Sequence, residues 1–273
     1  MTRVIIHAGF HKTGTTSLQR FLEINAAALA PYVHVLMKPQ MEDVASAARD
    51  CSNASFFRSN YFRRAAFRHL FFDLLKRTTL ENEQTLLISC EALVGRMPGR
   101  ENVTAFDAAV GLAKDMVNVA EKHFGDLDLT LLYTTRERDS WMRSAYSHLL
   151  HQSKFTMSEP EFAEKFGRAG DLDAIVMRIG QAIGPRVPVT SQLETTAAEQ
   201  FGPASVLVRL LDLPAEVNAT LEPAKHLNQQ LDAFEKSKLQ DFNAQDMTDA
   251  DLNQIKRRFL RKRRNRKKGQ END

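Results

Sequence analysis

The chain has 273 residues, 43% of them hydrophobic and 26% charged, which is ordinary usage for a globular protein. It holds no apolar stretch long enough to span a membrane, and apolar residues of a first strand follow the start at once. We therefore expect no membrane span or signal peptide, and a cytoplasmic location. Cys51 and Cys90 are too few for a disulfide framework and lack metal-ligand spacing, so we expect no metal.

Charge is unevenly distributed along the chain. The formal charge is +3, but residues 256–268 hold ten Lys or Arg and no acid, which leaves 27 basic and 34 acidic residues, a net charge of −7, elsewhere. Such a run is typical of a solvated terminus, so we predict a flexible basic tail over 256–273 behind a single domain over 1–255. The same cations could instead contact nucleic acid or an anionic membrane by releasing counterions.

The first part of the chain alternates between short apolar runs and longer stretches with helical apolar spacing. Parallel strands need crossover segments between them, and helices of this length can supply them. In chain order we expect a strand over 3–8, a helix over 15–28, a strand near 33–37, helical segments over 41–49 and 56–77, and a strand over 84–89.

The same alternation continues beyond a loop around 95–102. We expect a helix over 103–124, a strand over 128–135, a helix over 139–151, helical segments over 158–183, a strand near 186–190 and further helices broken at Leu213-Pro214. This order predicts an α/β fold, a three-layer sandwich with a central, mostly parallel sheet. Ligands of such sheets bind beyond the carboxyl ends of the strands.

The connection from the first strand to the first helix has the features of an anion-binding loop. Gly9 and Gly14 allow positive φ and close approach of the backbone to an anion, and the helix start offers unpaired N–H groups. Lys12 adds a mobile positive charge. We therefore predict a P-loop-like strand-loop-helix that binds phosphate or a related oxyanion through His11, Lys12, Thr13, Gly14, Thr15, Thr16 and Ser17.

The order of lysine and glycine separates this loop from that of ATPases and GTPases. Their loop reads G-x-x-x-x-G-K-[ST], whereas Lys12 here precedes Gly14 by two positions. The string His-Lys-Thr-Gly-Thr-Thr over 11–16 instead resembles Pro-Lys-Ser-Gly-Thr-Thr, the 5′-phosphosulfate-binding loop of sulfotransferases that use 3′-phosphoadenosine-5′-phosphosulfate (PAPS). The resemblance implies that Lys12 is catalytic and stabilises the leaving phosphate.

A second motif resembles the same family. An apolar run over 129–135 ends at Arg136, and Ser144 follows eight positions later, within the helix expected over 139–151. In PAPS-dependent sulfotransferases an arginine and a serine with this spacing bind the 3′-phosphate of the cofactor. The resemblance covers roughly residues 3–26 and 128–150, and it implies that Arg136 and Ser144 bind PAPS.

The proton acceptor of a sulfuryl transfer is expected at the end of another strand. Residues 85–90 have the apolar pattern of a buried strand, and Glu91 follows them directly. Glu91 would therefore lie at the same edge of the sheet as Lys12 and Arg136. Sulfotransferases place a histidine or glutamate base at the corresponding strand end, which implies a catalytic Glu91. As alternatives, Glu91 could be a first-turn acid favoured by a helix dipole, and His11 or His148 could be the base.

An arginine- and aromatic-rich segment follows at 56–72. The segment can be interpreted as a purely structural, amphipathic helix with a basic outer face. The alternative is that Arg58, Arg63 or Arg68 borders an acceptor pocket suited to a sugar or an anion.

The sequence thus predicts an enzyme that moves a sulfuryl group from PAPS to a hydroxyl, or to an amine, on a small molecule or carbohydrate, without a metal. One alternative is a P-loop kinase of a nucleotide or small metabolite, which would need Mg²⁺ and an acidic ligand such as Glu91. Another is a non-catalytic nucleotide- or nucleic-acid-binding protein that acts through the basic tail.

Overall fold

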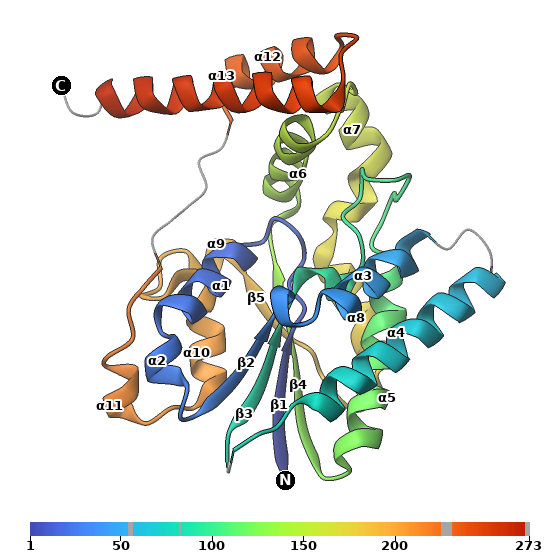
Figure 1. The fold of residues 1–273 in the computed structure, drawn as a ribbon, viewed down its shortest axis with the longest axis vertical. Coiled ribbons are helices and arrows are strands. Elements are labelled where there is room, and N and C mark those ends of the chain that lie inside the picture. Colours follow the sequence, from blue (N-terminus) through green and yellow to red (C-terminus); the bar gives the residue numbers. More distant parts are fainter. Residues whose placement is uncertain (54–56, 82, 225–230, 271–273) are drawn as a thin grey trace. The chain divides into compact units, whose positions relative to one another are not determined.

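A computed structural model of the protein describes residues 1–53, 57–81, 83–224 and 231–270. Its centre is a five-stranded sheet in the order β2-β3-β1-β4-β5, in which every neighbouring pair is parallel (Figure 1). The α/β class and the parallel sheet are therefore confirmed. The strands are β1 (Thr2–His7), β2 (Val33–Met37), β3 (Thr85–Ser89), β4 (Leu127–Thr135) and β5 (Val189–Gln192).

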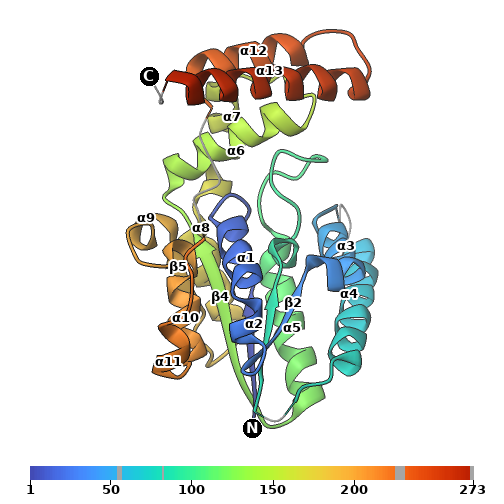
Figure 2. The same cartoon turned by 60° about the vertical axis from the view of Figure 1, so that its left-hand side comes forward.

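Helices connect the strands and cover both sides of the sheet (Figures 1 and 2). In the described residues they are α1 (Thr15–Ile24), α2 (Ala26–Leu29), α3 (Glu42–Asp50), α4 (Phe57–Arg77), α5 (Ala108–Phe124), α6 (Arg138–Gln152), α7 (Glu159–Phe166), α8 (Leu172–Ala182), α9 (Leu193–Thr196), α10 (Ser205–Leu211), α11 (Ala215–Asn218), α12 (Ala233–Asn243) and α13 (Asp249–Gln270). Short 3₁₀ turns are η1 (Lys38–Gln40), η2 (Cys51–Asn53), η3 (Glu91–Val94), η4 (Gly167–Gly170) and η5 (Gly202–Ala204).

Some boundaries differ from the sequence prediction for identifiable reasons. The helix expected over 15–28 is divided at Asn25, whose side-chain amide donates to the Glu222 carbonyl at 2.9 Å. The last strand begins at Val189, after Pro188, because proline cannot donate a hydrogen bond to a neighbouring strand. The helical stretch expected over 158–183 is two helices, α7 and α8, with η4 between them.

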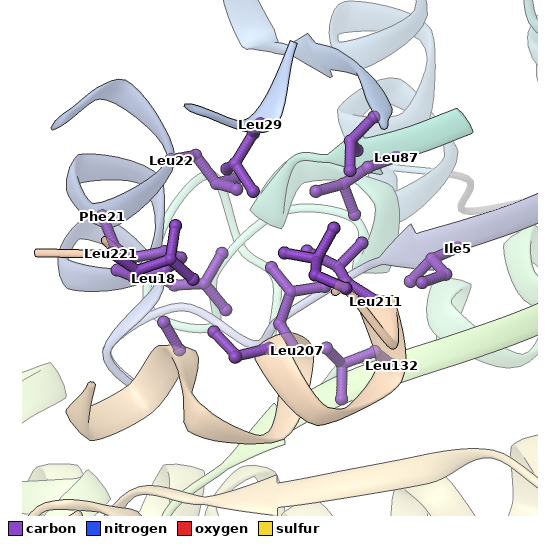
Figure 3. Packing of buried hydrophobic residues seen from close by; sticks show 14 residues of the cluster. Ile5, Leu18, Phe21, Leu22, Leu29, Leu87, Leu132, Leu207, Leu211 and Leu221 are labelled. Atoms are coloured by element: carbon purple, nitrogen blue, oxygen red, sulfur yellow. The ribbon is translucent and has the colours of Figure 1, made fainter. Parts of the chain in front are cut away.

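A large apolar cluster joins one side of the sheet to α1, α2 and α10 (Figure 3). Ile5, Leu87 and Leu132 contribute from β1, β3 and β4. Leu18 and Leu22 of α1 are four positions apart, so they lie on the same helical face and reach this cluster together. Burying each leucine contributes about 2 kcal/mol. The cluster thereby fixes the start of α1 near the carboxyl end of β1.

The described residues form two compact units. The first contains Met1–Trp141 and Arg168–Leu227, and includes the sheet. The second contains Met142–Gly167 and Asn228–Asp273, and includes most of α6 with α7, α12 and α13. The boundary expected at residue 255 falls inside α13. No helix in the described part of the chain is both long and apolar enough to cross a membrane.

A buried lysine caps the end of α6 within the second unit. The ammonium of Lys256 donates to the carbonyls of Leu150 and Ser153, both at 2.8 Å, although its side chain is almost completely buried. Burial lowers the pKa of Lys256 to about 8, a shift that Asp249 partly opposes. The unfolded chain therefore keeps a proton there up to about pH 10.4, while the folded chain releases it near pH 8.

The free energy of unfolding should accordingly rise between about pH 8 and pH 10.4 relative to that of Lys256→Met. The reason is that unfolding must take up a proton over this range. Urea unfolding followed across the range measures the effect, with Lys262→Met, an exposed lysine of the same helix, as the matched control. Parallel pH profiles for the wild type and Lys256→Met would contradict this account.

Candidate functional site

The connection between β1 and α1, residues 8–14 (the β1–α1 loop), lies at the carboxyl edge of the sheet. It extends the pairing with β4, since the N–H of Ala8 donates to Leu132 O at 3.0 Å and that of Phe10 to Thr134 O at 3.2 Å. The chain then turns sharply, with Lys12 at φ 70°. A non-glycine residue in this conformation costs about 1 to 3 kcal/mol, so the surrounding contacts must hold it there.

Two residues that follow β4 hold the carbonyls of this loop. The Arg136 guanidinium donates from Nη1 to Lys12 O at 3.1 Å. The indole of Trp141 donates from Nε1 to His11 O at 2.8 Å. The two segments that resemble sulfotransferase signatures therefore meet through hydrogen bonds between residues 124 and 130 positions apart.

A third carbonyl of the loop is also occupied, since the hydroxyl of Thr13 donates to Phe10 O at 2.5 Å. In a trans peptide the N–H points opposite to the C=O of the preceding residue. The N–H groups of His11, Lys12 and Thr13 therefore point away from the groups that bind the three carbonyls. Consecutive N–H groups can form a concave anion-binding site, so these three residues are the candidate for one.

The start of α1 adds further donors. Gly14 is its N-cap at φ 92° and supplies no side-chain cap, and no hydrogen bond within the described residues uses the N–H groups of Thr15 and Thr16. Only glycine fits at position 14, because a Cβ there would lie 2.9 Å from Pro203 Cγ in addition to the unfavourable φ. The unpaired N–H groups and the helix dipole favour a negative charge at this point.

Two cations converge on the loop. Burial lowers the pKa of Lys12, and the positive charge of Arg136 lowers it further. The Arg136 guanidinium is mostly buried; its Nε donates to Ser140 Oγ at 2.9 Å and lies 3.5 Å from a carboxylate oxygen of Glu194. Two partly desolvated cations repel each other, and an anion bound between them would relieve that repulsion.

Glu91 follows the neighbouring strand, β3. The parallel pairing of β1 with β3 sets His7 opposite Ser89, so the residues after both strands emerge at the same edge. Glu91 begins η3, is half-buried, and accepts a long hydrogen bond from Gln19 Nε2 of α1 at 3.4 Å. The structure thus brings Lys12, Glu91 and Arg136 to one edge of the sheet.

His11 presents an unpaired nitrogen at this edge. Its Nδ1 is buried and has no hydrogen-bond partner in the described part of the chain, and its ring stacks on Phe106 with centroids 6.1 Å apart. Burial lowers the pKa of His11 to about 4, although the charge of Glu91 opposes the shift. The imidazole is therefore neutral at neutral pH and able to contact a ligand, but it is a weak base.

The remaining residues of the predicted cofactor site lie on α1 and α6. Thr15 is buried and Thr16 is exposed, while Ser17 is half-buried in the first turn of α1. Ser144 is half-buried on α6, eight positions beyond Arg136, among the residues of the second unit. Its contact with a 3′-phosphate stays a prediction. His148 is half-buried on α6, also in the second unit, and stays an alternative base.

The arginines proposed for the acceptor lie on α4. The side chain of Arg58 is outside the described residues. Arg63 donates to a backbone carbonyl at the end of α3 at 2.8 Å, and Arg68 lies 3.2 Å from the buried carboxylate of Asp115. These contacts give both side chains structural partners, and their role toward an acceptor stays a prediction.

Several residues of this site were missing from the sequence prediction. Glu194 follows β5, His7 ends β1 and Thr134 lies near the end of β4, and none belongs to a local motif. Trp141 is the only tryptophan, which was a weak signal, but its bond to the loop depends on packing between segments far apart in sequence.

A scan of protein-family models finds no match to this chain, and a search of curated proteins likewise finds none. The interpretation therefore depends on the residues themselves. They provide N–H groups that no described residue uses, two cations and an adjacent carboxylate. Such a set can stabilise negative charge on a transferred group while the carboxylate accepts a proton from the attacking atom.

Inorganic sulfate should bind between Lys12 and Arg136 and raise the Tm of the wild type by about 2 to 4 °C at concentrations several times its Kd. The rise should be smaller in Lys12→Met. Thermal unfolding in sulfate, against chloride at equal ionic strength, measures this. Lys76→Met, which removes an exposed lysine of α4, is the control. Equal increases of Tm in the wild type, Lys12→Met and Lys76→Met would show that sulfate stabilises the protein as a general salt effect, without a specific binding site.

Proposed function

We propose that this protein is a sulfotransferase that transfers a sulfuryl group from PAPS to a hydroxyl, or to an amine, of its acceptor. The hydrogen bond from Arg136 to the Lys12 carbonyl, at 3.1 Å, is the observation that supports this proposal most strongly. It joins the segment that resembles a 5′-phosphosulfate loop to the arginine that resembles a 3′-phosphate ligand. A nucleotide with phosphates at both positions would need these two segments to be adjacent.

The β1–α1 loop would hold the phosphosulfate through its N–H groups and the start of α1. In PAPS one oxygen bridges the phosphorus and the sulfur. As the bond between this oxygen and sulfur breaks, negative charge grows on the oxygen. Lys12 is the cation on this loop, so it would stabilise that charge more in the transition state than in the ground state. Arg136 would hold the 3′-phosphate, for which a guanidinium can supply two parallel hydrogen bonds.

Glu91 would act on the acceptor. The acceptor oxygen attacks sulfur, its proton passes to the Glu91 carboxylate, and the sulfur–oxygen bond to the 5′-phosphate breaks with its electron pair on the phosphate. A carboxylate at this sheet edge suits the role because it is half-buried and lies near the cationic loop. A hydroxyl or amine on a carbohydrate or another small molecule is the proposed acceptor.

Adenosine 3′,5′-bisphosphate should bind the wild type without Mg²⁺, as measured by calorimetric titration. Arg136→Ala should weaken that binding by about 2 to 4 kcal/mol, because the phosphate loses a charged partner in a partly buried site. Lys12→Ala should abolish transfer from PAPS. Preferential binding of ATP with Mg²⁺ would instead favour a kinase, and unchanged bisphosphate affinity of Arg136→Ala would contradict the assignment.

Glu194 provides a second test of the same site. Its carboxylate lies 3.5 Å from Arg136 and would repel a phosphate bound there. Glu194→Gln should therefore tighten bisphosphate binding about fivefold, since removal of one partly exposed like charge is worth about 1 kcal/mol. Glu121→Gln, which alters a glutamate paired with Arg186 at the opposite edge of the sheet, should leave the affinity unchanged. Weaker binding by Glu194→Gln would show that the carboxylate positions Arg136 instead.

A further inference from the structure

A chain of buried polar side chains lies directly beneath the β1–α1 loop. It starts from His7, the last residue of β1, which is completely buried. The Nδ1 of His7 lies 2.8 Å from Ser89 Oγ of β3, and its Nε2 lies 3.4 Å from Thr134 Oγ1 of β4. The imidazole therefore bridges the two strands that flank β1.

The chain continues from the sheet into the loop. Thr134 Oγ1 lies 2.7 Å from Thr13 Oγ1, and Thr13 donates to Phe10 O at 2.5 Å. Ser89, His7, Thr134 and Thr13 are all buried. Four side chains thus connect the carboxyl edge of the sheet to the backbone carbonyl at which the loop begins to turn.

The direction of every hydrogen bond in this chain follows from its end. The Phe10 carbonyl can only accept, so Thr13 uses its proton there and must accept from Thr134. Thr134 has then used its own proton and must accept from His7, which fixes the proton of His7 on Nε2. In neutral imidazole the other nitrogen is an acceptor, so Ser89 donates to Nδ1. Each donor is used once and no two donors face each other.

Two further observations agree with this arrangement. Burial lowers the pKa of His7 to about 4, against the opposing charge of Glu91, so the imidazole is neutral at neutral pH as the chain requires. The loop backbone also packs directly against these hydrogen-bonded side chains, at Gly9. A Cβ at Gly9 would be 2.7 Å from His7 Nε2 and 2.8 Å from Thr15 Oγ1, and would overlap Thr134 Oγ1.

We propose that His7 is a positioning residue of the candidate site, and that its Nε2–H tautomer orients Thr134 and Thr13 and so sets the backbone of the β1–α1 loop. Through this chain the Phe10 carbonyl is held on one side of the turn, while Arg136 holds the Lys12 carbonyl on the other. The N–H groups between these carbonyls keep one orientation before any ligand arrives. That the oriented ligand is a phosphosulfate rests on the proposed function; the tautomer and the loop geometry do not.

The tautomer can be measured directly. In protein labelled with ¹⁵N at histidine, long-range ¹H–¹⁵N spectra at neutral pH should show His7 protonated at Nε2 and unprotonated at Nδ1. His7→Gln, which lacks this signal, assigns it among the eight histidines. A proton on Nδ1, or on both nitrogens, would overturn the proposal whether or not the protein is a sulfotransferase.

The effect on the loop is tested with a pair of variants at Thr134. Thr134→Val keeps the shape but removes the hydroxyl, so the loop loses its link to His7. Its affinity for inorganic sulfate and for adenosine 3′,5′-bisphosphate should fall about tenfold, or about 1.4 kcal/mol. Thr134→Ser restores the hydroxyl and should remain within about twofold of wild type, since the hydrogen bonds are retained.

Backbone amide spectra separate a positioning effect from general destabilisation. The amide signals of residues 11–16 should shift in Thr134→Val and return toward wild type in Thr134→Ser, while those of β2 and α4 stay unchanged. If His7→Leu and His7→Gln both fold, the amide signals of residues 11–16 are compared between them in the same way. If they do not fold, the proposal is tested by the two Thr134 variants alone. Unshifted loop signals in Thr134→Val would overturn the proposal. Failure of wild type to bind the bisphosphate would overturn only the proposed function.

Discussion

Parallel pairing of β1 with β4 is the constraint on which the rest of the candidate site depends. The register sets His7 opposite Leu132, so β4 continues three residues past the end of β1 and delivers Arg136 beside the loop. A shift of one residue would move Arg136 by about 3.3 Å along the strand and reverse the face of each side chain. The bond from Arg136 to the Lys12 carbonyl would then be lost.

The loop held by this register has an energetically unfavourable shape. Lys12 adopts a left-handed conformation, and the backbone cost is offset by hydrogen bonds to the three carbonyls of Phe10, His11 and Lys12, each worth about 1 kcal/mol. These bonds have a second consequence, because they turn the N–H groups the other way. If the loop binds the proposed anion, the groups that fix its fold also orient its N–H groups in advance, which reduces the ordering cost of binding.

Local patterns predicted the α/β class, the parallel sheet and the approximate strands, because apolar periodicity and turn residues are encoded in neighbouring positions. Predictions missed where distant residues decide the outcome. Asn25 divides the expected helix over 15–28 because its amide binds the Glu222 carbonyl, 197 positions away. The flexibility predicted for the basic run stays a prediction; as far as Gln270 this run belongs to α13, and Lys256 near its start is buried.

The sequence by itself determined the composition of the site: the spacing of Gly9, Lys12 and Gly14 between a strand and a helix, and a strand that ends on Arg136. Only the tertiary structure decided how these parts are joined. His7 finds its partners 82 and 127 positions away, and Trp141 reaches a carbonyl 130 positions away. A motif specifies which groups are present, but strand register and core packing decide which atoms come within hydrogen-bonding distance.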